Sequence, residues 1–198
     1  MKSLKLTLLS LTMLLLSLPA VQAAETDSVL ALTKGKVNEV IEVLKQKQLP
    51  KEERARKIIE IIDDIFDFQL MASLSLGKKH WSPLSKEERK EFSELFVERI
   101  KQSYLDKLDL YTDQQVVVEE ANQVKNNRIE VLTYLVGGGD RMEMIYKMYK
   151  TRDGGWKVYD VDISGVSFVQ TYRSQFEGVL QNQSFAELMD RMRSKEQL

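Results

Sequence analysis

The sequence predicts an α+β fold in which a curved antiparallel sheet of about four strands packs against a layer of helices. Three observations support this class. Apolar residues recur at helical spacing through the first half of the chain, residues 116–163 alternate as strands between tight turns, and the helical period returns after Ser164-Gly165. The last strand therefore leads directly into a helix that has to pack back over the sheet.

The part of the chain before the sheet predicts several helices. Leu49-Pro50 separates the first two, because proline cannot continue a helix. Gly77 is a typical residue to end the third. Ser85 and Glu88 form a capping box in front of the fourth. The expected helices are 27–48, a second from about 51, a short helix over 68–77, and a long helix that continues towards Tyr111.

Turn residues divide the next part of the chain into short strands. Consecutive strands joined by tight turns predict an antiparallel meander. A second capping box, Ser184 with Glu187, precedes a short final helix. The expected strands are 116–118, 129–136, 141–151 and 156–163, followed by helices over about 166–179 and 184–194.

The chain begins with the features of a secretory leader. Lys2 and Lys5 precede an apolar run from Leu6 to Leu18, and small residues at 21–23 form a cleavage box. The run is shorter than the roughly 20 residues that a membrane span needs. We therefore expect a signal peptide over 1–23 and a single domain over 24–198 that is located in the periplasm.

Composition excludes some partners. Loss of the two leader lysines leaves 27 basic against 30 acidic side chains, which argues against nucleic acid as a ligand. The sequence contains no cysteine, so neither lipidation at the cut nor a disulfide is expected, and stability has to come from packing.

The strand over 141–151 has the clearest alternating pattern. Met142, Met144, Tyr146 and Met148 point to one face, and the opposite face is mainly charged. Thioether side chains are unbranched and adapt to irregular apolar shapes. On pattern alone an ordinary core is the better interpretation, and an apolar cavity is the alternative.

The preceding strand leaves its inward face open, because both of its faces are largely apolar. Glu130 favours the odd-numbered positions as the inward set. The two possible sets are Ile129, Val131 and Leu135, or Leu132, Tyr134 and Val136.

Polar residues do not suggest catalysis. His80 lies in a basic segment and is expected to be a solvated loop residue, since no nucleophile and base surround it. Asp160 and Asp162 alternate on one strand and favour a strand-end or capping role over acid–base or metal chemistry. We expect no enzyme activity, no cofactor and no metal site.

Several short segments, taken in order, resemble a known family. They are residues 156–176 (WKVYDVDISGVSFVQTYRSQF), Phe66-Asp67-Phe68, Met71-Ala72, Leu76-Gly77, Trp81, and the helix positions Phe92, Phe96, Tyr104, Leu108 and Tyr111. Together they are similar to the MlaC family (toluene-tolerance auxiliary proteins), periplasmic phospholipid carriers of Gram-negative bacteria. The likeness covers roughly residues 29–188. The glycines at 137–139 and Thr171, where an amide is expected, depart from the family pattern.

The resemblance implies a lipid cavity between the sheet and the helices, and it favours the cavity interpretation of the methionine face. Arg173 then has two possible roles, an ion pair with a nearby acid or a contact to a lipid phosphate at the cavity mouth. The candidate lipid-binding residues are Leu70, Met71, Leu74, Phe96, Ile100, Val131, Met142, Met144, Tyr146, Met148, Val166, Val169, Tyr172 and Arg173.

The resemblance also implies partners. These are an inner-membrane ABC transporter complex with MCE domains and an outer-membrane lipoprotein–porin complex, which together maintain outer-membrane lipid asymmetry. The protein itself is expected to be a monomer that binds phospholipid. Two other functions remain as alternatives: a periplasmic chaperone for lipoproteins or secreted proteins, and an α+β enzyme with an acid–base pair in its pocket, which the Met142–Met148 face does not offer.

Overall fold

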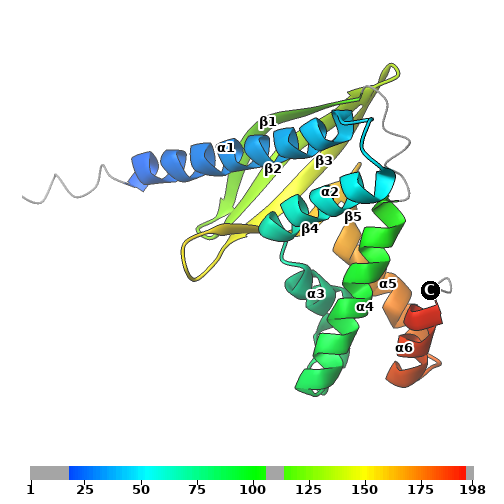
Figure 1. Cartoon of the computed structure of the whole chain (residues 1–198). Coiled ribbons are helices and arrows are strands. Elements are labelled where there is room, and N and C mark those ends of the chain that lie inside the picture. The colour runs from blue at the N-terminus through cyan, green and yellow to red at the C-terminus, as the bar shows by residue number, and fades with distance from the viewer. Residues whose placement is uncertain (1–17, 106–113, 195–198) are drawn as a thin grey trace, which may run out of the picture.

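The structure is a computed structural model that describes residues 18–105 and 114–194, with side chains described from 23 to 101 and from 114 to 194. An antiparallel sheet has helices α1 and α2 over one face, and α3 to α6 are grouped together at one end (Figure 1). The elements are α1 (Leu18–Lys45), α2 (Lys51–Ile65), α3 (Phe68–Trp81), α4 (Lys86–Leu105), β1 (Gln115–Lys125), β2 (Arg128–Gly137), β3 (Asp140–Lys150), β4 (Trp156–Ile163), β5 (Val166–Ser167), α5 (Phe168–Leu180) and α6 (Phe185–Ser194).

This arrangement confirms the predicted α+β class, with corrections at the edges of elements. Among the described residues, none of the helices has the length and apolarity needed to cross a bilayer. The expected continuation of the long helix towards Tyr111 and the first 17 residues of the expected leader lie outside the described residues. Helix α1 begins at Leu18, so the cut expected before Ala24 falls within it, and the leader remains a prediction.

The sheet is a simple meander in the order β1-β2-β3-β4-β5, with each neighbour antiparallel. The register places Val131 opposite Tyr146 and Tyr146 opposite Val161, so these three side chains form one row across the inner face. The register shifts within β1 and between β3 and β4, as it does at a β-bulge, and such shifts bend and twist a sheet.

Strand β1 is longer than the expected 116–118, because its pattern continues through polar residues such as Glu119 and Asn122. An antiparallel edge strand can face water over much of its length, so its sequence shows little hydrophobic alternation. Val166 was expected in a helix but lies in the two-residue β5. Ser164 and Gly165 both adopt positive φ, 51° and 83°, and this tight turn folds Val166 back to pair with Ile163.

Buried apolar side chains of the described residues form separate clusters. One holds α3, α4, α5 and α6 together and includes the contacting rings of Phe92, Phe96 and Phe176, whose centroids are 5.3 to 6.2 Å apart. A second joins α1 and the end of α2 to the inner sheet face around Val131 and Met148. A smaller third cluster joins α1 to α2. The region between these clusters contains the site described below.

Both predicted capping boxes are present. The Ser85 amide donates to Glu88 Oε2 (2.7 Å), and the Glu88 amide donates to Ser85 Oγ (3.1 Å). Ser184 and Glu187 repeat the arrangement at 2.7 and 3.3 Å. Gly77 adopts a non-helical conformation (φ 75°, ψ 154°) that ends the helical segment begun at Phe68, as expected, and a second helical segment of α3 follows this kink and extends to Trp81.

Asp160 ties the sheet to α5. Its side chain accepts hydrogen bonds from the Val169 amide (3.0 Å), the Ser167 hydroxyl (2.7 Å) and Lys147 Nζ (3.2 Å), although Asp160 is 5% exposed. The capping role expected for this aspartate is confirmed. A buried carboxylate is stable only with such partners, and here they fix the first turn of α5 against β4.

Replacing Asp160 with alanine should lower the free energy of unfolding by about 2–4 kcal/mol, because it leaves the α5 amide without its acceptor and Lys147 with only its longer contact to Asp162. Asp162→Ala is the matched control, since Asp162 makes a longer 3.7 Å contact with the same Lys147; it should cost less than about 1 kcal/mol. Urea denaturation measures both. Equal losses in the two variants would show that Asp160 does not anchor α5.

Candidate functional site

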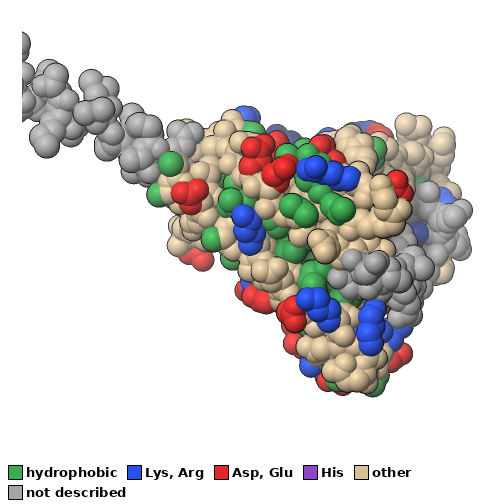
Figure 2. Space-filling model, turned by 90° about the horizontal axis from the view of Figure 1, so that it is seen from above, with side chains coloured by type: hydrophobic (Ala, Val, Ile, Leu, Met, Phe, Trp, Pro, Cys, Tyr) green, Lys and Arg blue, Asp and Glu red, His purple; other side chains and the backbone are tan. Residues whose placement is uncertain are grey.

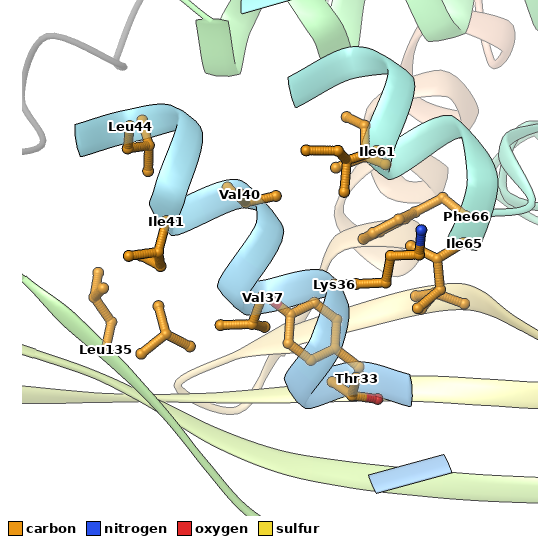
Figure 3. A pocket seen from close by; sticks show the side chains of 14 residues that line it. Thr33, Lys36, Val37, Val40, Ile41, Leu44, Ile61, Ile65, Phe66 and Leu135 are labelled. Carbon is orange, nitrogen blue, oxygen red and sulfur yellow. The ribbon is translucent and has the colours of Figure 1, made fainter. Parts of the chain in front are cut away.

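Two apolar cavities adjoin each other between the inner sheet face and the helices. The first, which we call the α1 cavity, has a volume of about 250 Å³. Figure 3 shows Val37, Val40 and Ile41 of α1 facing the same space as Ile61 of α2, with Leu135 of β2 at one side. Its full lining is Thr33, Lys36, Val37, Val40, Ile41, Leu44, Ile61, Ile62, Ile65, Phe66, Val116, Leu135, Tyr146 and Val158.

The second, which we call the α4 cavity, has a volume of about 300 Å³ and lies between α2, α3, α4, the start of α5 and the sheet. Each cavity is near the lower limit for ligand pockets, and the two together fall inside the usual range. The lining consists of Ile58, Ile62, Phe66, Phe68, Met71, Ile100, Lys101, Met144, Tyr146, Val161, Ile163 and Phe168.

Three residues belong to both cavities: Ile62, Phe66 and Tyr146. The Phe66 ring stacks on Phe68 with centroids 5.4 Å apart and meets the Tyr146 ring edge-on at 6.3 Å. Burial raises the pKa of Tyr146, so its hydroxyl remains neutral at ordinary pH. These side chains form an apolar partition between the two spaces.

The chain between α2 and α3 holds Phe66 in place. Phe66 makes an isolated parallel bridge with Val158, and the Asp67 amide donates to the Val158 carbonyl (2.8 Å). The Asp67 carboxylate caps α3 by accepting from the Leu70 amide (2.9 Å) and also accepts from the Tyr149 hydroxyl. The bond to Asp67 raises the pKa of Tyr149 to about 12. The end of α2 is thus pinned to β3 and β4.

Charged groups occur at the borders of the cavities. Lys36 in the α1 cavity pairs with Asp64 (2.7 Å) and Glu39 (3.3 Å). The hydrogen bond to Asp64 raises the pKa of Lys36, and the same bond lowers the pKa of Asp64. Lys101 in the α4 cavity pairs with Asp63 at 2.7 Å. Seen from above, hydrophobic side chains reach the surface among such charged groups (Figure 2).

The structure brings four of the predicted site residues together. Met71, Ile100, Met144 and Tyr146 all line the α4 cavity. The inward face of β3 is therefore the expected one. The odd-numbered positions of β2 also face inward, since Ile129, Val131 and Thr133 are fully buried. Whether these side chains contact a lipid remains a prediction.

Other predicted site residues are packed against protein. Val131 and Met148 belong to the cluster that joins α1 to the sheet, and Phe96 and Val169 belong to the helical cluster. Leu74 and Tyr172 pack against that helical cluster as half-buried residues. Leu70 is half-buried and is not among the lining residues of either cavity.

Three predicted site residues lie elsewhere. Met142 is 37% exposed and Val166 is 60% exposed, the latter because β5 turns it away from the helix. Phe168, the first residue of α5, lines the α4 cavity instead. The exposed Arg173 is on α5 with its guanidinium against Gly77, away from the lining of both cavities. Its expected contact to a lipid phosphate at a cavity mouth remains a prediction.

His80 also differs from expectation. It lies in the last turn of α3 and not in a loop, and its Nε2 is 3.0 Å from the Glu177 carboxylate on α5. Hydrogen bonds from Lys79 and His80 lower the pKa of Glu177. The pair joins α3 to α5 at the surface. In the described part of the chain, no three acidic, histidine or cysteine side chains are grouped to hold a metal ion.

Sequence reasoning missed the contribution of α1 and α2. Their apolar faces were recognised, but none of their residues was assigned to the cavity. The available signal was α2 itself, whose isoleucines at 58, 61, 62 and 65 cover more than one face of a short helix. A helix with so much apolar surface needs apolar neighbours on two sides.

Comparison with known proteins agrees with this architecture. The family model described as MlaC protein matches residues 34–194. The intermembrane phospholipid transport system binding protein MlaC of Haemophilus influenzae is 28% identical over 117 residues, covering 57% of this chain and 55% of that protein. The match thus spans about half the length of that relative.

A solved structure shows the same fold. The phospholipid-binding protein from Ralstonia solanacearum, determined in complex with a phospholipid, matches with a TM-score of 0.73 at 21% identity. The match covers 83% of this chain and 94% of that chain. Since the family model extends from α1 through the end of α6, this chain belongs to the MlaC family.

Proposed function

We propose that this protein is a periplasmic phospholipid carrier that holds acyl tails in the α1 and α4 cavities while it crosses water between the inner and outer membranes. The observation that carries the proposal is the pair of adjoining apolar cavities on the inner sheet face. A partition of three side chains, Ile62, Phe66 and Tyr146, separates them. Family membership and the fold match to a phospholipid-binding protein support it.

The magnitude of the hydrophobic effect explains why such a carrier is needed. Two acyl chains hold roughly 30 methylene groups, and exposing each to water costs about 0.8 kcal/mol, or roughly 25 kcal/mol in all. A lipid therefore cannot diffuse freely across water at a useful rate. A covered slot removes this cost, and the lining described above is apolar over nearly all its surface.

The hydrophobic effect cannot give this protein a direction of lipid transport. Transfer of tails from a bilayer to a protein cavity exchanges one apolar medium for another, so the hydrophobic term nearly cancels. Direction must then come from partners. The family resemblance implies an inner-membrane MCE-domain ABC transporter complex and an outer-membrane lipoprotein–porin complex, which this protein would serve as the soluble component of a lipid-asymmetry system.

Loading requires the helices and the sheet to separate. Helix α2 is the wall common to both cavities, and its outer edge is tied by the ion pairs Lys36–Asp64 and Lys101–Asp63. The aspartates of both pairs are exposed to solvent, which screens the ion pairs, so opening and closing them costs little free energy. Gly165 at the β4–β5 turn and the glycines at 137–139 are candidate hinges.

Organic extraction of the purified protein followed by mass spectrometry should recover diacyl phospholipid at close to stoichiometric amounts. The lipid should stay bound during purification, because leaving the cavity would expose its tails to water. Extraction of a periplasmic protein of similar size without a cavity controls for carry-over. Extracts without phospholipid from several preparations would contradict the carrier function. Copurifying protein in place of free lipid would indicate the chaperone alternative.

Met144→Lys should leave the protein folded but reduce its lipid content at least about tenfold, because an ammonium against acyl chains costs several kcal/mol to desolvate. Val117→Lys makes the same change at a position that is 43% exposed on β1 and lines neither cavity. It should retain full lipid. Circular dichroism and extracted lipid per mole of protein measure the two effects. A fully loaded Met144→Lys protein would show that the tails lie elsewhere.

A further inference from the structure

Among the described residues that line the α4 cavity, Lys101 alone carries a charge. It lies on α4, next to Ile100, whose side chain lines the same cavity and is 6% exposed. Its stem thus passes along apolar surface, and its Nζ lies 5.6 Å from the centroid of the Phe68 ring. Long cationic side chains commonly bury the stem and keep the charged end in water.

The ammonium lies at the boundary between the cavity and solvent. The Lys101 side chain is 19% exposed, whereas its partner Asp63, on the outer edge of α2, is 45% exposed. Lys101 Nζ donates to Asp63 Oδ2 at 2.7 Å. A positive charge is therefore held at the rim of an otherwise apolar cavity, and a carboxylate on the neighbouring helix balances it.

We propose that Lys101 binds the phosphate of a phospholipid whose tail occupies the α4 cavity, and that the phosphate replaces the Asp63 carboxylate as its acceptor. This inference rests on the proposed carrier function. Tails buried in the cavity leave the phosphodiester of the same molecule at the rim, where the ammonium lies. Carboxylate and phosphodiester oxygens accept the same charge-assisted hydrogen bond from an ammonium.

Lys36 is a weaker candidate for this role. It faces two carboxylates, Asp64 and Glu39, so its charge is already compensated on both sides. Arg173 lies against Gly77, outside the cavity linings. Of the cations considered, Lys101 alone combines a stem in a cavity, an end at the rim and one acidic partner among the described residues.

The exchange of Asp63 for a lipid phosphate at Lys101 affects which lipid is bound more than how tightly it is bound. Because the phosphate displaces an existing ion pair, the net gain is the difference between two similar interactions at a partly exposed site, which amounts to a few-fold in binding. The expected preference is for lipids that carry phosphate over lipids with the same tails and no phosphate. Two substitutions act on this preference in opposite directions.

The test offers delipidated protein to phosphatidylcholine vesicles that contain small, equal mole fractions of dioleoyl phosphatidylglycerol and dioleoylglycerol. After the vesicles are removed, mass spectrometry gives the ratio of the two lipids bound to protein. Lys101→Met keeps the apolar stem and removes the charge, and it should lower the ratio about fivefold. Asp63→Asn removes the competing carboxylate and should raise the ratio about twofold.

Lys90→Met is the matched control, because Lys90 is a 76% exposed lysine on the same helix, paired with Glu94 and absent from the cavity lining. It should leave the ratio unchanged. Excess inorganic phosphate should also leave the ratio unchanged, since it lacks the tails that hold the headgroup at the rim. If excess inorganic phosphate abolishes the preference for phosphatidylglycerol over dioleoylglycerol, Lys101 is a site for free anions and the proposal is overturned.

The outcomes separate this inference from the proposed function. If Lys101→Met and Asp63→Asn lower the ratio together, the pair is a tether between α2 and α4, and the inference is wrong. If both lipids load but neither variant changes the ratio, the inference is wrong and the carrier function stands. If the wild-type protein takes up no lipid from the vesicles, phosphatidylcholine included, the carrier function itself is overturned.

Discussion

The alignment of Val131, Tyr146 and Val161 across β2, β3 and β4 is the constraint on which the rest of the site depends. Side chains alternate along a strand, so a slip of one residue would bring side chains of the opposite face, charged Lys147 of β3 among them, to the cavity side. Two interactions oppose such a slip. The Thr133 hydroxyl donates to the Met144 carbonyl across β2 and β3 (3.0 Å), and Lys147 on β3 pairs with Asp160 on β4.

The part of the molecule that contains the cavities depends for its stability on the well-packed cluster of α3 to α6. An empty apolar cavity costs on the order of 24 cal/mol per Å³, so an unfilled space of about 300 Å³ costs up to about 7 kcal/mol. This is an upper bound, because the α4 cavity meets water beside Lys101. It is still comparable to the whole stability of a typical domain. The aromatic cluster of α3 to α6, anchored to β4 through Asp160, supplies the compensating packing.

Sequence patterns predicted those features that depend on periodicity or on local hydrogen bonding. Alternation in β3 identified the inward side chains of Met144 and Tyr146, and the capping boxes predicted where α4 and α6 begin. The pattern did not distinguish Met148, which is packed in a core, from Met144, which borders a cavity. Both environments are apolar, and only the positions of neighbouring elements decide whether a side chain meets protein or space.

Charged residues were harder still to place. Arg173 was a reasonable candidate for a phosphate contact because it follows Tyr172 on the helix that leaves the sheet, yet its guanidinium lies against Gly77 of α3, a contact between distant segments that the sequence does not reveal. Lys101 gave no signal in sequence, since it is one of several lysines on an amphipathic helix. Its position becomes informative only when α2 brings Asp63 to the same rim.

Helix α2 therefore combines the two properties that an amphiphile requires of its binding site. Its isoleucines form walls of both cavities, while the adjacent Asp63 and Asp64 reach outward to lysines on α4 and α1. The apolar walls treat every pair of similar tails alike, because the hydrophobic term is nearly the same in a bilayer and in the cavity. Small electrostatic differences at the rim are then the terms left to orient the lipid and to distinguish one headgroup from another, and they can be large enough to discriminate without holding the lipid too tightly to release.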